Sequence, residues 1–398
     1  MNPHFPSEIW RTIFHFATFT VTSLNAKDWA PHWPHSRIRQ FSSPPPYYNV
    51  TLKTKKALSL VSTHFRDISI EFMFETVQIH HARQARHLAD TIQSHSSSPA
   101  RWIKSIIIFL DKQDDIYVVD ATLIQILPHC TNLTAFGWES PTVKYPTLNR
   151  TRDKSSELMK SIPLGIKTLE WNRKSSGISF KCLRHHASLC QFRLNEVLAD
   201  SSVDDAITLP SITHLEVRQL STCTPIANWN LPSLSHLTID WTTGNLSGHL
   251  WDTLRSVSIT DRWASGSDTF QGIIARLPNL ESLFYHIDVG TFGGKLEKAW
   301  LGVRHHQSLT EIHIYCLAPI ILNQQDAPLY TVEELFSRHL HPIMTGSLPL
   351  LRNVRILNAS VVFDVAGFQE DVRTDGVDFF ANLSEQLSTP AVRVGFQM

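Results

Sequence analysis

A short apolar pattern recurs along this chain between residues 103 and 356. Each copy has an apolar residue, two variable positions, a second apolar residue, one variable position and a third apolar residue. The ten copies are Ile103/Ile106/Ile108, Leu133/Phe136/Trp138, Ile166/Leu169/Trp171, Leu189/Phe192/Leu194, Ile212/Leu215/Val217, Leu234/Leu237/Ile239, Leu254/Val257/Ile259, Leu280/Leu283/Tyr285, Leu309/Ile312/Ile314 and Leu351/Val354/Ile356. By subtraction, successive first positions are 30, 33, 23, 23, 22, 20, 26, 29 and 42 residues apart.

Repeats of about 20–29 residues built on this spacing are typical of a leucine-rich-repeat solenoid. We therefore expect an α/β fold, with a parallel sheet on the concave face and helices on the convex face. The uneven steps indicate an irregular solenoid with insertions. Such a fold presents an extended binding surface and has no built-in catalytic cleft.

The segments between the predicted strands carry helical patterns. We expect short helices at Asp120–Leu127, Ser155–Ile162, Phe270–Leu277, Leu296–Val303 and Val332–Ile343. A helix at Val377–Leu387 and a strand at Val392–Phe396 are expected to form a C-terminal cap, since an end repeat otherwise exposes its core face.

Alternation along each strand sends the pattern residues inward and the intervening residues to the concave surface. The candidate substrate-binding residues are Glu170, Arg193, His214, Glu216, Arg218, His236, Asp240, Phe284, His286, His313, Tyr315 and Arg355. Mixed charge, histidine and aromatic side chains favour protein recognition over nucleic acid, which would require a basic stripe. The alternative for any one of these residues is that it is polar only because it is solvated.

The composition indicates which partners and which cellular compartment to expect. Lys+Arg and Asp+Glu are equal at 36 each, so a strongly phosphate-seeking or membrane-binding surface is not expected. The five cysteines are scattered and favour reduced thiols. No signal peptide or membrane span is recognisable, and a cytoplasmic or nuclear location is expected.

The N-terminal 81 residues have a different, helical pattern. Pro6 and Ser7 precede Ile9, Ile13, Phe14 and Phe16, which suit one helix. From Val21 to Asn49 the periodicity is lost, and the proline-rich segment SSPPPYY at 42–48 predicts a non-helical loop. Helical periodicity returns from 57 to 74, followed by a strand at 76–79 and an amphipathic helix at 82–94.

Two stretches of this region, FPSEIWRTIFHFA (5–17) and ALSLVSTHFRDISIEFMFETVQI (57–79), resemble the F-box of fungal proteins of the mushroom type, which often precedes degenerate leucine-rich repeats. Phe5 stands where the family usually has leucine, and Phe65 where it usually has tryptophan. About thirty residues are inserted after the first helix. A longer loop costs only about 0.6 kcal/mol per doubling of its length.

The resemblance implies an adaptor role in a cullin-based ubiquitin ligase. The F-box would bind a Skp-type adaptor through Pro6, Ile9, Ile13, Leu60 and Phe65, and the repeats would hold the protein substrate. The alternative is a protein-binding repeat scaffold in which the N-terminal helices only cap the first repeat. The implied domains are an F-box-like domain at 1–81 with a loop inserted at about 21–52, a connecting helix and linker at 82–100, and the repeats with their cap at 101–398.

Catalytic and metal motifs do not stand out. The sequence has no G-x-S-x-G or H-E-x-x-H, and the adjacent histidine pairs at 80–81, 185–186 and 305–306 lack the further ligands that a metal site needs. We expect no cofactor, no metal and no enzymatic activity of this chain itself.

Overall fold

The computed structural model describes residues 6–18, 46–94, 99–110, 114–139, 154–172, 180–195, 207–218, 229–239, 252–259, 276–288, 305–317, 340, 343, 345, 348–359, 381–385 and 388–397. Two compact units divide the chain. The first includes the described residues up to 214 and residues 229–231, and the second includes residues 215–218 and those from 232 onward.

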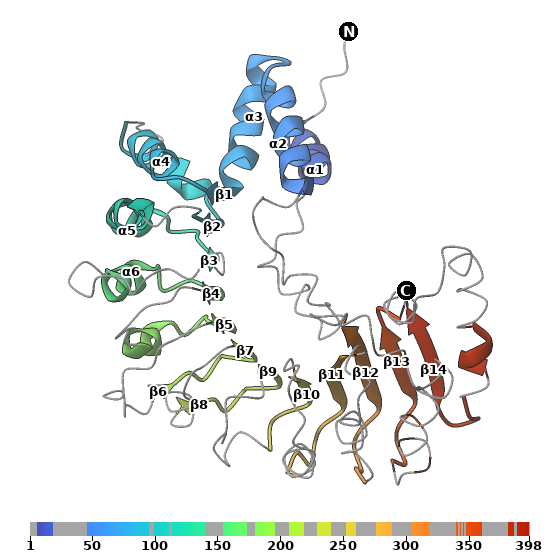
Figure 1. The fold of residues 1–398 in the computed structure, drawn as a ribbon. Coiled ribbons are helices and arrows are strands. Elements are labelled where there is room, and N and C mark those ends of the chain that lie inside the picture. Colours follow the sequence, from blue (N-terminus) through green and yellow to red (C-terminus); the bar gives the residue numbers. More distant parts are fainter. Residues whose placement is uncertain are drawn as a thin grey trace, which may run out of the picture. The chain divides into compact units, whose positions relative to one another are not determined.

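Three helices open the first unit (Figure 1). They are α1 (Ser7–Thr18), α2 (Pro46–Ser59) and α3 (Thr63–Glu75), and we call them the helical trio. The helical periodicity predicted over 57–74 is divided between α2 and α3, and Ser62 caps α3, its hydroxyl accepting a hydrogen bond from the backbone N–H of Phe65 at 3.1 Å.

The prediction of a non-helical loop through residue 52 is wrong for its last seven residues, because α2 already begins at Pro46. Proline is favoured in the first turn of a helix, where its fixed φ is helical and its missing N–H would have had no partner. The remaining insertion, 21–45, lies outside the described residues.

Aromatic side chains form the core of the helical trio. Phe14 of α1 is 1% exposed, and its ring centroid lies 5.1 Å from that of Phe65 and 6.3 Å from those of Trp10 and Phe72. The edge-to-face geometry of Phe14 on Phe65 is the arrangement that aromatic quadrupoles prefer. Helices α1 and α3 are therefore held together by rings from both.

Two contacts between Glu75 and Lys104 join the helical trio to the first repeat. The Glu75 carboxylate, at the end of α3, forms an ion pair with Lys104 Nζ at 2.8 Å, and the Glu75 backbone carbonyl accepts a hydrogen bond from the Lys104 backbone N–H at 3.0 Å. Lys55 of α2 is almost fully buried. Burial lowers the pKa of Lys55, and the negative charge of Glu75 opposes that shift.

All ten predicted repeat strands are present, and neighbouring strands pair parallel from β1 through β5 and from β9 through β14. In the first unit β1 (Thr76–Ile79) leads the order β1-β2-β3-β4-β5. The other strands there are β2 (Ser105–Phe109), β3 (Ala135–Glu139), β4 (Thr168–Asn172) and β5 (Gln191–Asn195), with a two-stranded pair β6 (Ile207–Thr208) and β8 (Trp229–Asn230) beside them in sequence.

The second unit continues the same construction in the order β7-β9-β10-β11-β12-β13-β14. Its strands are β7 (His214–Arg218, all but its first residue), β9 (His236–Ile239), β10 (Ser256–Ile259), β11 (Ser282–Asp288), β12 (Glu311–Leu317), β13 (Asn353–Leu357) and β14 (Arg393–Gln397). The strand predicted as part of a cap is thus β14, which pairs parallel with β13 as one more repeat strand.

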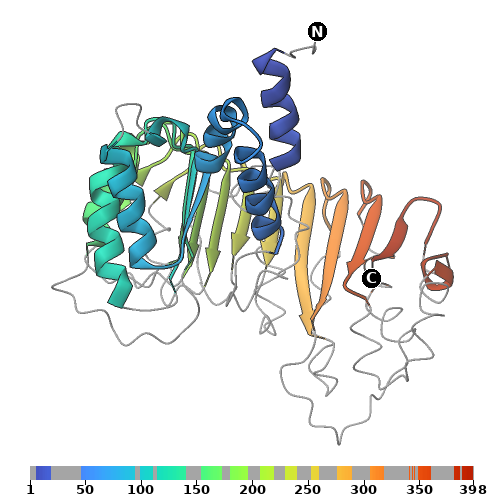
Figure 2. The ribbon, with the colours of Figure 1, turned by 90° about the horizontal axis from the view of Figure 1, so that it is seen from above.

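The apolar pattern makes the core. All thirty pattern residues are at most 5% exposed, and the largest are Trp138 and Trp171, whose ring centroids lie 6.2 Å apart on adjacent strands. In the first unit, helices α4 (Ala82–Ser94), α5 (Asp114–Ile126) and α6 (Ser155–Ser161) lie on one side of the strands (Figures 1 and 2). Short 3-10 helices at Pro99–Trp102, Leu127–His129 and Phe180–His185 complete the return segments.

Of the other predicted helices, 296–303 and most of 270–277 lie outside the described residues. Leu340 and Ile343 are helical, as are residues 381–385, within two segments where helices were predicted.

One backbone arrangement recurs just before the strands. The carbonyl of Lys104 accepts two successive N–H groups, from Thr134 at 2.9 Å and Ala135 at 3.0 Å. In the second unit the carbonyl of Arg255 accepts those of Glu281 at 2.7 Å and Ser282 at 3.0 Å. Each repeat is thereby fixed to the next, and the turn carbonyls have partners.

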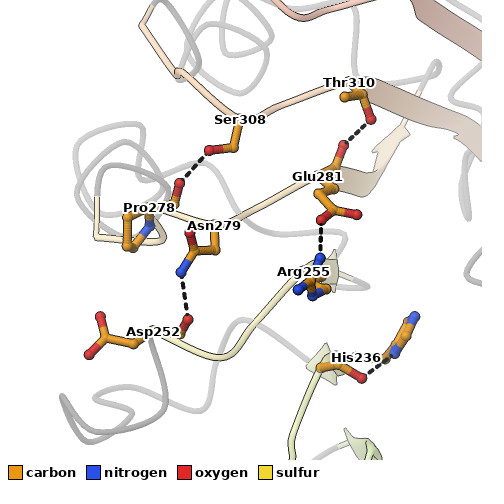
Figure 3. Close-up of polar contacts among 9 residues, drawn as sticks. His236, Asp252, Arg255, Pro278, Asn279, Glu281, Ser308 and Thr310 are labelled. Atoms are coloured by element: carbon orange, nitrogen blue, oxygen red, sulfur yellow. Dashed lines mark hydrogen bonds and ion pairs between the residues drawn. The ribbon is translucent and has the colours of Figure 1, made fainter.

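Side-chain hydrogen bonds add to these backbone bonds in the turns before the strands (Figure 3). In the second unit Asn279 Nδ2 donates to the Asp252 carbonyl at 2.8 Å, and Ser308 Oγ donates to the Pro278 carbonyl at 2.6 Å. Thr310 Oγ1 donates to the Glu281 carbonyl at 2.9 Å. These bonds explain why polar residues were found in the turns that precede the strands.

Four cysteines lie among the described residues, and all four are free thiols, as the sequence suggested. Cys130 and Cys316 are buried, whereas Cys182 and Cys190 are half-buried. Burial raises the pKa of the Cys130 thiol to about 12, so this side chain packs as a small neutral group.

Replacing a core tryptophan should show how much each repeat depends on its pattern residues. We expect Trp171→Ala to lower the free energy of unfolding by about 3–5 kcal/mol, because it removes a fully buried ring and leaves a cavity. Urea unfolding followed by circular dichroism measures the change. The control Leu164→Ala removes a side chain that is 61% exposed and should cost no more than about 0.5 kcal/mol. Equal losses for the two variants would contradict this account of the core.

Candidate functional site

Helix α1 exposes an apolar stripe on the side opposite its buried ring. Ile9 is 43% exposed, Ile13 is 45% exposed and Phe16 is 77% exposed. Residues spaced by three or four share one face of a helix, so these three side chains form a continuous row. Phe14 points the other way, into the helical trio, which explains how one short helix serves both a core and a surface.

The turn between α2 and α3 adds two more exposed apolar side chains. Leu60 is 78% exposed and Val61 is 65% exposed. Their backbone N–H groups donate to the carbonyls of Ala57 and Leu58, at 3.1 and 3.3 Å, so the turn is hydrogen-bonded. Held in this way, Leu60 and Val61 project from an ordered segment.

The five residues expected to contact an adaptor fall into two groups. Pro6, Ile9, Ile13 and Leu60 are exposed. Phe65 is only half-exposed, because its ring packs on Trp10, with centroids 4.7 Å apart, and on Phe14. Phe16 and Val61 were not among the predicted contacts, although Phe16 follows Ile13 at a spacing of three and could have been found by extending that row.

In the first unit, the face between the pattern residues carries polar pairs in register. Glu170 of β4 lies opposite Arg193 of β5, and Arg193 Nη1 donates to Glu170 Oε2 at 3.1 Å. Two residues earlier on the same two strands, Thr168 Oγ1 donates to Gln191 Oε1 at 3.0 Å. The Glu170 and Arg193 side chains are 8% and 17% exposed, so this ion pair is largely removed from water.

In the second unit, four predicted surface residues form a ring cluster instead. Phe284 and His286 of β11 lie opposite His313 and Tyr315 of β12. The centroids of Phe284 and His313 are 6.4 Å apart with nearly parallel planes, and those of His286 and Tyr315 are 5.4 Å apart. Phe284 and His313 are 0% exposed, and His286 and Tyr315 are 9% exposed.

Alternation alone therefore did not predict exposure. The register confirms that these residues share the face opposite the pattern residues, but Glu170, Glu216, Phe284, His286, His313 and Tyr315 are all buried. On a multi-stranded parallel sheet, large side chains at matching register positions pack on one another and exclude water. His214 and His236 are half-exposed and Arg355 is exposed, while the Arg218 side chain and Asp240 lie outside the description.

Glu311 supplies the charge beside the ring cluster. It accepts hydrogen bonds from His313 Nε2 at 3.2 Å and from Asn353 Nδ2 at 3.3 Å. Partial burial acts to raise the pKa of Glu311, but the His313 contact, the Asn353 bond and the charge of Arg355 outweigh it and hold that pKa below 4.5. The contacts of Glu311 thus favour its ionised carboxylate. On the same strand, burial raises the pKa of the Tyr315 hydroxyl.

Within the described ranges, histidines, cysteines and carboxylates do not gather into a group of three that could hold a metal ion. In the same residues, no helix has both the length and the apolar content to cross a membrane.

Comparison with known proteins gives only distant similarity. No family model and no curated protein matches this sequence. Among solved structures, the leucine-rich-repeat protein LegL7 of Legionella pneumophila is 11% identical, with 76% of this chain and 95% of that chain covered and a TM-score of 0.41. The chain of the TLR13–ssRNA13 complex is 14% identical, with 73% of this chain and 36% of that chain covered and a TM-score of 0.34. At these scores, the repeat architecture is established by the strands and buried pattern of this chain itself.

The coupling between Glu170 and Arg193 can be measured from the unfolding free energies of single and double variants. Arg193→Met alone should lower the free energy of unfolding by about 3 kcal/mol, because it leaves a buried carboxylate without this cation. Glu170→Gln/Arg193→Met should cost less than Arg193→Met, since the remaining charge is then gone. Urea unfolding of both single variants and the double variant measures the coupling. Additive losses would show that the two side chains do not interact.

Glu311 makes a prediction about acid stability. A carboxyl whose pKa is lowered by folding stabilises the native state fully above its unfolded pKa, here about 4.5, and loses that contribution as pH falls through the lower folded value. The wild-type free energy of unfolding should therefore fall more steeply below pH 4.5 than that of Glu311→Gln. Denaturant titrations at several pH values measure both slopes, and parallel curves would contradict the assignment.

Proposed function

We propose that this chain is the substrate receptor of a ubiquitin ligase of the Skp/cullin/F-box type. In this proposal the helical trio binds a Skp-type adaptor, and the repeats bind the protein substrate. Other subunits carry out ubiquitin transfer, so the contribution of this chain is to hold the substrate in place.

The distribution of exposed apolar side chains carries this proposal. Eight large apolar residues are strongly exposed among the described residues, and six of them belong to the helical trio or its turn. These six are Ile9, Ile13, Phe16, Leu60, Val61 and Ile70. A concentration of this kind on one small region marks a surface that another protein covers.

The same distribution weighs against the alternative of a simple cap. A cap that only closed the first repeat would turn its apolar face toward the strands and bury it. Phe14 and Ile68 do supply such a core, at 1% and 3% exposure, but Ile9 and Ile13 remain in water. Covering an exposed Ile or Phe fully gains about 1.5–3 kcal/mol, so partial burial of several could contribute substantially to adaptor binding.

The proposed adaptor contacts differ in kind. Ile9, Ile13 and Leu60 offer their side chains directly to a partner, Phe16 extends the α1 row, and Val61 is exposed next to Leu60 in the turn. Phe65 contributes by holding α3 against α1 through Trp10 and Phe14. A variant of Phe65 would therefore disturb folding as well as binding and is a poor test.

The proposed substrate surface is the sheet face that carries the intervening residues. In the second unit, His236 is half-exposed and Arg355 exposed on that face, and in the first unit His214 is half-exposed. A solenoid face of this type suits an extended partner, because each repeat adds one strand of contact.

The adaptor contact can be tested directly with the full chain. Ile9→Asp/Ile13→Asp should weaken binding to a purified Skp-type adaptor at least tenfold, since two charges would be buried in an apolar interface. Isothermal titration calorimetry measures the dissociation constant. Both positions are exposed, so the variant should keep the circular dichroism spectrum of the wild type.

The control is Leu164→Asp, which places one aspartate on an exposed apolar position outside the helical trio. It should bind the adaptor as the wild type does. If the wild type does not bind the adaptor, or if the double variant binds unchanged, the chain is better described as a repeat scaffold without a ligase role.

A further inference from the structure

The last two strands of the second unit and the residue before them carry exposed arginines that form no ion pair with a described residue. Arg355 of β13 and Arg393 of β14 are exposed, and Arg352 lies exposed at the start of β13. Among the described residues, none of the three makes an ion pair or a side-chain hydrogen bond. Elsewhere in the second unit, Arg255 is paired with Glu281.

The strand register places two of these arginines on one face. Asn353 lies opposite Arg393, and Arg355 lies opposite Gly395. Residues two apart on a strand share a face, so Arg355 and Arg393 are diagonal neighbours on it. A strand spacing of about 4.8 Å and a rise of about 3.3 Å per residue put their Cα atoms about 8 Å apart, within reach of a single extended anionic segment.

Glycine at position 395 leaves room beside them. A Cβ atom placed on Gly395 would meet no atom within 4 Å. The space above the backbone next to the Arg355 side chain is therefore open, and a bound chain could approach the strand closely there. A larger residue at this position would fill that space without requiring a left-handed backbone.

Among the described residues on this face, the positive charge of the two arginines is not balanced. On the neighbouring strand β12 the acid is Glu311, which acts on Arg355 through its charge but already accepts hydrogen bonds from His313 and Asn353. Arg355 and Arg393 carry two positive charges on this face against the one engaged carboxylate of Glu311, on a chain whose total formal charge is zero. Guanidinium groups donate paired hydrogen bonds that fit carboxylate and phosphate oxygens.

We propose that Arg355 and Arg393, with Arg352 at the rim and Gly395 as the open floor, recognise an anionic segment of a bound protein. The shared chemistry is a group of carboxylate or phosphate oxygens presented on an extended chain. This proposal deepens the substrate-receptor function and rests on it for the biological role of the site. It names the class of segment that the repeats hold.

The test uses three fluorescein-labelled peptides of equal length with the full chain. One is a neutral Gly-Ser peptide, one carries four glutamates and one carries two phosphoserines, which separates the two sources of negative charge. Fluorescence anisotropy gives the dissociation constants. We expect at least one anionic peptide to bind tenfold more tightly than the neutral peptide, and Arg355→Gln/Arg393→Gln to remove that preference.

The control variant is Arg276→Glu, which changes the net charge by the same two units at an exposed arginine in the second unit. It should alter anionic binding less than twofold. If Arg276→Glu weakens binding as much as the double variant does, or if neither anionic peptide is preferred, the proposal is overturned.

Gly395→Leu gives a second test that leaves every charge in place. It should weaken binding of the preferred anionic peptide at least fivefold by filling the open space, and wild-type affinity for this variant would contradict the assigned floor. No adaptor is present in these assays, so their failure would leave the adaptor contact of α1 standing. Loss of adaptor binding would likewise leave the peptide result standing.

Discussion

The fold depends on the contact of each repeat strand with its neighbours. Three apolar side chains per repeat are buried only when adjacent strands stack in register, as Trp138 does on Trp171. The turn carbonyl of Lys104 fixes the spacing by accepting two N–H groups from the next repeat. Because stability in such an array comes from nearest neighbours, variation in one return segment changes little elsewhere.

The helical trio precedes the first repeat strand, and its apolar residues fall into a buried group and an exposed group. Phe14 and Phe65 hold α1 on α3, and the backbone and side-chain contacts of Glu75 with Lys104 join α3 to the first repeat. Ile9 and Ile13 are left in water on the other side of α1. An adaptor bound there would be linked to the repeats through an ordered connection.

The face between the pattern residues differs from place to place. In the first unit it holds the Glu170–Arg193 ion pair, and in the second it holds the ring cluster beside Glu311. At the last two strands it becomes open and positively charged, where Arg355 and Arg393 lie beside Gly395. Where large or paired side chains lie on this face they bury one another, whereas Gly395 leaves the backbone uncovered.

The sequence alone determined the repeat strands, the thirty core positions and the starts of α1 and α4, because hydrophobic spacing is a local property. It did not determine that Pro46 begins α2 or that β14 pairs parallel with β13. Exposure was decided by the tertiary structure alone. Alternation placed Phe284 and Arg355 on one face, but only packing between neighbouring strands could bury the first and leave the second in water.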